Sequence, residues 1–134
     1  MNELSRWREQ ALGVLRIVAG FLFLQHGGQK LFGWFGGQTV ELASLMGLAG
    51  IIELVGGFLI MIGLFTRIAA FITSGEMAVA YFMAHVPRGA LPLQNNGEHT
   101  VLFCFIFLYL VFAGAGAFSV DRMRAGGRSA ERVT

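Results

Sequence analysis

The chain has 134 residues, 55 % of them hydrophobic and only 13 % charged, and its mean hydropathy is +0.65. Because soluble domains carry about 25 % charged residues, this composition excludes an ordinary soluble domain and predicts one membrane domain. The formal net charge is +2, and the arginines gathered in the C-terminal tail are typical of a membrane-segment flank, not of a nucleic-acid-binding patch. The single cysteine, Cys104, excludes an intramolecular disulfide and a cysteine-based metal cluster.

The first predicted membrane helix follows a polar N-terminal segment, residues 1–10. Apolar residues run from Ala11 to about Gly33 and are interrupted by Arg16, His26 and Lys30. A secretory signal peptide would be shorter, would have an uncharged core and would end in a small-residue cleavage site. We therefore expect a retained transmembrane helix.

Glycine is frequent in this chain and regularly placed in the first helix. The 19 glycines are about twice the usual share of roughly 7 %. Gly13, Gly20 and Gly27 are spaced by seven residues, and Arg16 and Lys30 project onto the same helix face within about 60°. Small residues let helix backbones approach closely in membranes. This stripe therefore predicts a tight helix contact that also carries two positive charges.

A short polar connection, Phe35–Leu42, leads to the second predicted helix, which spans about Ser44–Leu64. Glu53 lies close to the middle of this helix, and Gly56 and Gly57 share its face. A lone charge that faces lipid at this depth costs at least roughly 2.5 kcal/mol. Glu53 should therefore turn inward, on a strip where another helix can come close.

The third predicted helix, about Ile68–Val86, contains Glu76. His85 lies nine residues after Glu76, on the opposite side of an ideal helix, so it joins the same site only if the helix bends or ends first. The one substantial loop, residues 87–97, contains both prolines and the turn signal Asn95-Asn96-Gly97.

The fourth predicted helix runs from about Glu98 to Val120. Glu98 and Tyr109 share one face of it, which places a phenol inside the membrane below a carboxylate. From Asp121 on, the sequence predicts a polar, basic and mobile tail, residues 121–134. The predicted fold is all-α: an integral membrane four-helix bundle over residues 11–120, between two polar ends.

Loop charges predict the orientation of this bundle. Four spans put both termini on one side, and by the positive-inside rule that side is cytoplasmic because it holds seven arginines, against Arg88 on the other side. The seven are Arg6, Arg8, Arg67, Arg122, Arg124, Arg128 and Arg132. Glu53 and Glu76 then fall near the midplane. The residues expected towards the outer face are His26, Lys30, His85, Glu98 and His99.

Three interpretations of the embedded polar residues stay open. Arg16 and Lys30 can snorkel to the interface along their apolar stems. The charges can instead form structural ion pairs that fix the helix register. In the third interpretation, the buried acids form a protonatable site or a polar ligand pocket, since ionisable residues inside a membrane often mark the working site.

A metal site made by His26, His85 and His99 is a further alternative, because imidazoles beside a glutamate suit zinc, iron or copper. No two of these histidines have the i, i+3 or i+4 spacing that makes a local helical clamp. The residue pattern therefore favours a site without a metal.

Several pieces of the chain together resemble the DoxX family of small bacterial and archaeal four-helix membrane proteins. The resemblance covers about Leu15 to Asp121 and includes the pieces LRIVAGFLFLQHGGQKLFG, IIELVGGFLIMIGLFTRIAA, MAVAYFMAH, NGEHTVLF and GAGAFSVD. The motif set is Arg16, His26-Gly27, Lys30, Glu53-x-x-Gly56-Gly57, Gly63, Thr66-Arg67 and Gly114-x-Gly116 before Asp121. This set is specific in combination.

The resemblance implies a multi-pass protein of the bacterial inner membrane. The family takes its name from a subunit of an archaeal thiosulfate:quinone oxidoreductase. Its mycobacterial relatives are associated with a membrane complex for thiol and radical detoxification, and distant eukaryotic relatives act as cargo receptors or receptor chaperones. Family resemblance thus leaves both an enzyme subunit and a non-catalytic partner open.

Our leading hypothesis is a membrane subunit of an oxidoreductase system that binds a quinone or another small redox ligand in the outer half of the bundle. Glu53 and Glu76 would handle protons, and Tyr109 would line the approach. The residues expected to hold the ligand's polar head are Arg16, His26, Lys30 and Glu98. The rival hypothesis is a non-catalytic partner or assembly subunit of a larger complex, in which the charges are structural. Both hypotheses predict membrane lipid and other membrane proteins as partners, and no nucleic acid.

Overall fold

The computed structural model describes residues 3–133, with side chains described for residues 3–126, and every regular element in this range is helical. In chain order these are η1 (Glu3–Trp7), α1 (Arg8–Phe32), η2 (Trp34–Gly36), α2 (Leu45–Ile62), α3 (Thr66–Ala80), η3 (Tyr81–His85), η4 (Val86–Arg88), α4 (Pro92–Asn95), α5 (Glu98–Ala113) and α6 (Val120–Val133). The prediction of an all-α fold is confirmed. The tail that we expected to be mobile from Asp121 on forms α6.

Three helical segments of the described chain are long and apolar enough to cross a membrane: Glu3–Phe32, Leu45–Ile62 and Thr66–Arg88. The apolar helix α5 has only 16 residues and spans about 24 Å, less than the roughly 30 Å of a bilayer core. We predicted that this helix would continue to Val120, and that boundary was wrong. Gly114 ends α5 because its φ of 82° lies outside the helical range.

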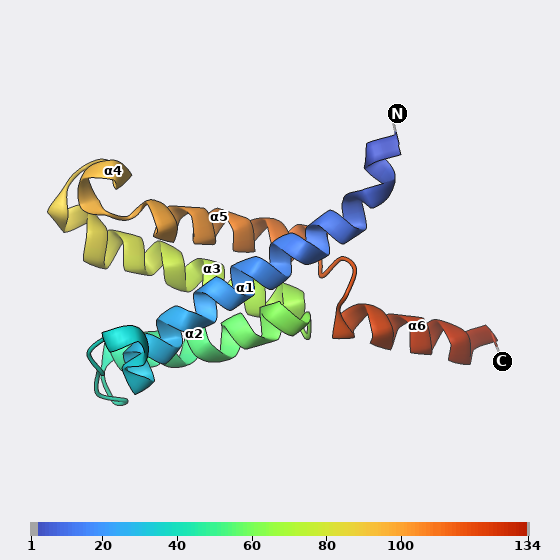
Figure 1. The fold of residues 1–134 in the computed structure, drawn as a ribbon, viewed down its shortest axis with the longest axis horizontal. Helices are drawn as coiled ribbons and strands as arrows, with labels where there is room; N and C mark the ends of the chain where they lie inside the picture. Colours follow the sequence, from blue (N-terminus) through green and yellow to red (C-terminus); the bar gives the residue numbers. More distant parts are fainter. Residues whose placement is uncertain (1–2, 134) are drawn as a thin grey trace.

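The long helices pack as two pairs, α1 with α2 and α3 with α5. α2 and α3 are consecutive, and the tight turn at Gly63–Phe65 joins them. The N-terminus and the C-terminus lie at the same end of the molecule, which we call the termini end (Figure 1). The connections η2 and η3–α4 lie at the opposite end, the loop end.

Glycines bring the backbones of α1 and α2 into contact, as their seven-residue spacing predicts. A Cβ added at Gly20 would lie 2.6 Å from the backbone nitrogen of Met61, and one at Gly57 would lie 2.7 Å from that of Leu24. Gly27 is likewise against the backbone of Leu54. No other residue type permits this approach, so the glycines set the register of the first helix pair.

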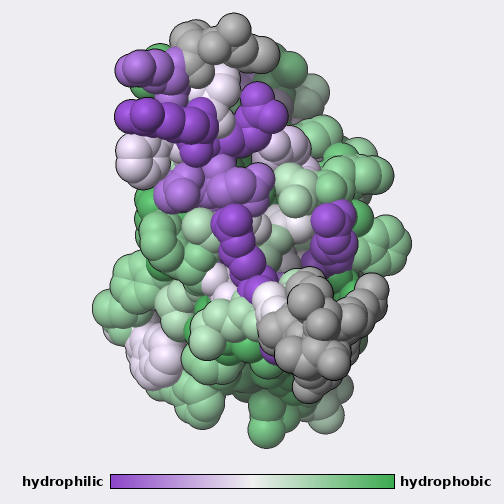
Figure 2. Space-filling model, turned by 90° about the vertical axis from the view of Figure 1, so that its right-hand side faces the viewer, coloured by the Kyte–Doolittle hydropathy of each residue, from purple (hydrophilic) through white to green (hydrophobic). Residues whose placement is uncertain are grey.

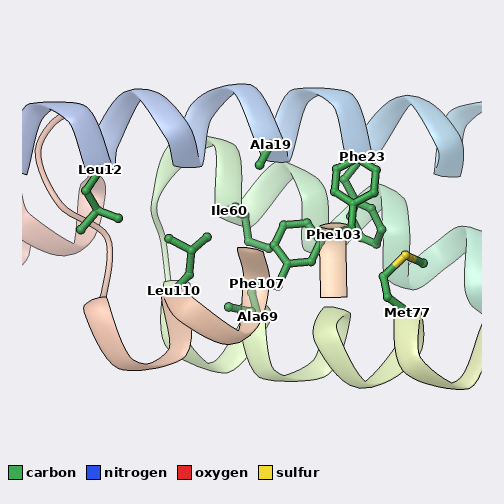
Figure 3. Close-up of a cluster of buried hydrophobic side chains, with 10 residues drawn as sticks. Leu12, Ala19, Phe23, Ile60, Ala69, Met77, Phe103, Phe107 and Leu110 are labelled. Carbon is green, nitrogen blue, oxygen red and sulfur yellow. The ribbon is translucent and has the colours of Figure 1, made fainter. Parts of the chain in front are cut away.

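A hydrophobic core joins the two helix pairs, with side chains from α1, α2, α3 and α5 pointing inward (Figure 3). Its centre is aromatic: the ring of Phe23 lies 5.3 Å from that of Phe103 and 4.8 Å from that of Phe107. Ile60 and Leu110 are fully buried beside these rings. The core fills the middle of the molecule between the helix pairs.

Hydrophilic residues gather on the termini end, which Figure 2 views directly, while hydrophobic residues cover much of the surrounding surface. Figure 1 shows α6 leading away from the helix pairs at this end. A hydrophobic surface with one polar end is what a membrane protein presents at the boundary between lipid and water.

Candidate functional site: a polar pocket at the loop end

A cavity of about 650 Å³ lies between the two helix pairs in the half of the molecule nearer the loop end. Residues from α1, α2, α3, η3 and α5 line it, and most of these residues are apolar. Its polar lining residues are His26, Lys30, Glu53, Glu76, His85, His99 and Thr100. An apolar cavity with a few convergent polar groups is the usual form of a small-molecule site.

Lys30 of α1 and Glu53 of α2 form an ion pair on the wall of this pocket. Glu53 is only 2 % exposed, so its charge is paired within the protein and not by solvent. The pair forms because Gly27 and Gly50 let the two helices approach at this level. Removal of one partner from a buried pair leaves an uncompensated charge, which typically costs about 3–5 kcal/mol.

Glu76 of α3 faces the same pocket but is not satisfied in the same way. Both of its carboxyl oxygens are buried, and neither has a hydrogen-bond partner among the described residues. The carboxyl groups of Glu76 and Glu53 are close enough to interact electrostatically, and to share a hydrogen bond when one of them carries a proton. An unpartnered buried carboxyl costs stability, so its presence in a cavity marks a place where a ligand atom, a water molecule or a proton completes the structure.

Three histidines gather at the loop end of the pocket. The rings of His26 and His99 are stacked with centroids 5.6 Å apart, and His85 meets His99 edge-on at 5.8 Å. The predicted condition for His85 is met, because α3 widens into the π-helix η3 at Tyr81–His85 and the regular helical register is lost there. His85 and Glu76 therefore line one pocket, although an ideal helix would have placed them on opposite sides.

The histidine cluster lacks the arrangement of a metal site. The described residues contain no group of three or more His, Cys, Asp or Glu residues that could hold a metal ion. His85 already uses both ring nitrogens: Nδ1 lies 3.0 Å from the carbonyl oxygen of Asn95, and Nε2 lies 3.3 Å from Oγ1 of Thr100. The observed geometry assigns His85 to the packing of the loop.

Arg16 lies far along α1 from this pocket, near the termini end. It is fully buried, and all five of its N–H groups donate to backbone carbonyls at 2.7–3.0 Å. The acceptors are Ile60, Met61, Ala115, Ala117 and Phe118. Arg16 thus holds the end of α2 to the segment between α5 and α6, and it has no donor left for a ligand.

Glu98 and Tyr109 lie on the outward face of α5. Glu98 is exposed at the first position of the helix, and Tyr109 is 55 % exposed. The inward face carries Thr100, Phe103 and Phe107 instead. The structure therefore brings together Glu53, Glu76, His26 and Lys30 of the expected site residues and leaves Arg16, Glu98 and Tyr109 outside the pocket.

Sequence reasoning missed Thr100 and Phe103 as lining residues of the pocket. Both belong to one α5 stripe with Phe107, at spacings of three and four residues. This stripe was a usable signal. It was hidden because α5 is apolar on every side, so its inward face does not stand out.

A second set of polar contacts, at the termini end, is structural. The carboxylate of Asp121 accepts hydrogen bonds from the backbone N–H groups of Phe65 at 2.8 Å and Thr66 at 2.9 Å. Partial burial alone would raise the pKa of Asp121, but these hydrogen bonds and the charge of Arg124 outweigh it and hold the pKa below its ordinary value. Arg67 donates to the carbonyls of Val111 and Phe112 at the end of α5.

Apolar helices of membrane-crossing length and a pocket of buried ionisable groups define this molecule as a helical membrane protein. The chain belongs to the DoxX family, whose model matches residues 11–86. An uncharacterised protein of Haemophilus influenzae is 44 % identical over 90 % of this chain and 96 % of its own length.

Two further relatives carry descriptive names. "Inner membrane protein YqjF" of Escherichia coli is 31 % identical over 82 % of this chain and 88 % of its own length. "Putative oxidoreductase CatD" of Bacillus subtilis is 27 % identical over 81 % of this chain and 82 % of its own length. No solved structure matches the chain.

Proposed function

We propose that this protein is a membrane subunit of an oxidoreductase system and that the loop-end pocket binds the head of a quinone-like ligand. The observation that carries the proposal is Glu76, whose buried carboxyl oxygens face a cavity of about 650 Å³ and have no hydrogen-bond partner in the described part of the chain. The name of the B. subtilis relative supports the reaction class.

The polar groups suit the head of a quinone. Lys30 supplies an ammonium group whose N–H bonds can also reach a ligand carbonyl oxygen, because the side chain is partly exposed beside its partner Glu53. Glu76 can donate one hydrogen bond when protonated and accept others when ionised. A quinone has two carbonyl oxygens on one flat ring, and the apolar and aromatic walls, Phe23 and Phe103 among them, match the faces of that ring.

The proposal places the protein in the bacterial inner membrane with four crossings and both termini in the cytoplasm. The name of the E. coli relative and the arginine asymmetry support this placement. It requires α5 to cross together with residues that flank it, since α5 alone is short. Cysteine placed at Arg88 in a Cys104→Ala background should label from outside intact cells, and cysteine placed at Arg124 should not.

A second candidate function is a non-catalytic partner of a larger membrane complex. The observation in its favour is that Arg16 serves only the protein's own backbone. This candidate predicts a protein that folds and assembles normally when the pocket carboxyl is lost and that binds no quinone.

The test is equilibrium binding of menadione, a naphthoquinone without a tail, and of the matching tail-less ubiquinone headgroup to the purified protein in nanodiscs. We expect one of the two to bind and Glu76→Met to weaken that binding several-fold, since a hydrogen bond contributes about 0.5–1.5 kcal/mol and each 1.4 kcal/mol is a factor of ten. Glu98→Met is the matched control, because Glu98 is an exposed carboxylate outside the pocket. Failure of the wild-type protein to bind either headgroup would contradict the proposal and favour the partner role.

A further inference from the structure

Exposed lining residues on both helices place an opening of the pocket between α2 and α3. These helices meet at the tight turn Gly63–Phe65 and diverge towards the loop end, which Figure 1 shows clearly. The cavity lies in this widening space and is lined by residues of both helices. Its position follows from the short turn, because two helices joined so closely at one end can be held apart only at the other.

The exposed residues that line this cavity are apolar except for His99 of α5. Six large apolar residues line the cavity although each is about half exposed on the protein surface. They are Leu45, Met46 and Leu48 of α2, Ile72 and Val79 of α3, and Met83 of η3, with exposed fractions of 61 %, 49 %, 52 %, 50 %, 56 % and 58 %. A residue that is both a lining residue and exposed marks the mouth of a cavity. An apolar mouth on a membrane helix faces the acyl chains of the lipid.

Gly75 leaves the mouth open at its centre. Gly75 lines the cavity and is exposed, and a Cβ added there would meet no heavy atom of the described residues within 4 Å. The glycines of the α1–α2 contact are the opposite case, because the neighbouring backbone fills the space beside them. Glu76 lines the same cavity, so Gly75 and the unpartnered carboxyl border one continuous space.

The order of groups along this path matches one class of molecule. Apolar side chains line the mouth, and the ion pair Lys30–Glu53, the carboxyl of Glu76 and the imidazole of His26 lie further in. We infer that the ligand is a tailed quinone that enters from the lipid between α2 and α3, with its head at these polar groups and its isoprenoid tail in the gap beside Gly75. This inference rests on the proposed function and adds the route of entry and the need for a tail.

The experiment compares quinones that share a headgroup and differ in the tail. Menadione and a menaquinone with a short isoprenoid tail form one such pair, and the corresponding ubiquinones form a second pair. Each is titrated into nanodiscs that contain the wild-type protein, Gly75→Phe or Gly75→Leu, and the retained quinone is extracted and quantified. Ile68→Phe is the matched control, because it adds an aromatic ring at an exposed position of α3 outside the pocket.

We expect Gly75→Phe to weaken binding of the tailed quinone at least tenfold and Gly75→Leu to weaken it by a smaller factor. Binding of the tail-less headgroup should change less than about twofold in both variants, and Ile68→Phe should change neither. If the wild-type protein bound both probes and Gly75→Phe bound the tailed quinone as tightly as wild type, the lateral route would be overturned while the proposed function stood. Equal weakening of both probes would also overturn the route, because the added ring would then occupy the head site. Absence of binding to any headgroup would instead refute the proposed function.

Discussion

The two ends of the helix bundle use the same kinds of residue for different purposes. At the termini end, Arg16 gives all five N–H groups to backbone carbonyls, and Asp121 caps the start of α3. At the loop end, the carboxyl of Glu76 is buried without a hydrogen-bond partner among the described residues, and Gly75 borders open space. A buried charge and a glycine therefore indicate packing when backbone fills the space beside them. At the loop end the space beside them is empty, and both border the cavity.

The largest expected effect is at the termini end. Arg16→Gln removes most of the donors that serve five carbonyls and leaves several of these carbonyls buried and unpaired. We expect a loss of about 3–5 kcal/mol in the free energy of unfolding, the scale for removing a partner from a buried charged network, and hence little folded protein. Expression level and thermal unfolding in detergent measure this effect. Near-wild-type stability would show that these hydrogen bonds do not hold the end of the bundle together.

Two glycines sharpen the comparison, because replacing each by alanine should change the stability of the protein in opposite directions. Gly20→Ala places a Cβ 2.6 Å from the backbone nitrogen of Met61, so the helix pair must separate and stability should fall by about 1–3 kcal/mol. Gly75→Ala meets no described atom and replaces a flexible residue within a helix, so stability should rise by about 0.5–1 kcal/mol. Both values come from unfolding in one detergent. A fall of equal size in both variants would remove the contrast between filled and open glycine sites.

Asp121 should make a smaller and pH-dependent contribution. Its pKa is lowered below the ordinary value of 3.8 because hydrogen bonds from Thr66 and Phe65 and the charge of Arg124 outweigh the effect of partial burial. A lowered pKa in the folded state means that the stabilisation is complete above the ordinary pKa and is lost as the pH falls from about 3.8 through the folded value.

We therefore expect Asp121→Asn to cost about 0.5–2 kcal/mol at neutral pH, the range for a helix N-cap. Below pH 4 the stability of the variant should fall less than that of wild type, because asparagine does not titrate. Unfolding at pH 7 and at low pH checks both parts. Parallel pH profiles for wild type and variant would mean that Asp121 carries no such linkage.

The sequence predicted the first three helices to within a few residues because each has a clear apolar run and residues that mark where a helix starts or ends. Ser44 accepts a hydrogen bond from the backbone N–H of Gly47 at the start of α2, and Gly63 ends α2 with a φ of 72°. The sequence did not predict which face of α5 points into the protein, since that helix is apolar on every side.

The sequence also left open which basic residue of α1 forms an ion pair with Glu53. Arg16 and Lys30 lie on one face but about 21 Å apart along the helix axis, so Glu53 can reach only one of them. The choice depends on the register of α1 against α2, which the glycine contacts set only in the folded structure. Lys30 forms the pair, and Arg16 binds the backbone.

The central claim is that Glu76 serves a ligand and not the fold, and the stability of Glu76→Met tests it most directly. Methionine keeps much of the shape of glutamate and removes the unpartnered buried carboxyl. Thermal unfolding of ligand-free wild type and Glu76→Met should be compared in the same detergent at pH 7. The account predicts a variant at least as stable as wild type, and more stable by about 1–3 kcal/mol if the full desolvation cost of the carboxyl is relieved. A variant less stable than wild type by about 1 kcal/mol or more would show that Glu76 has a structural partner, and it would contradict the claim.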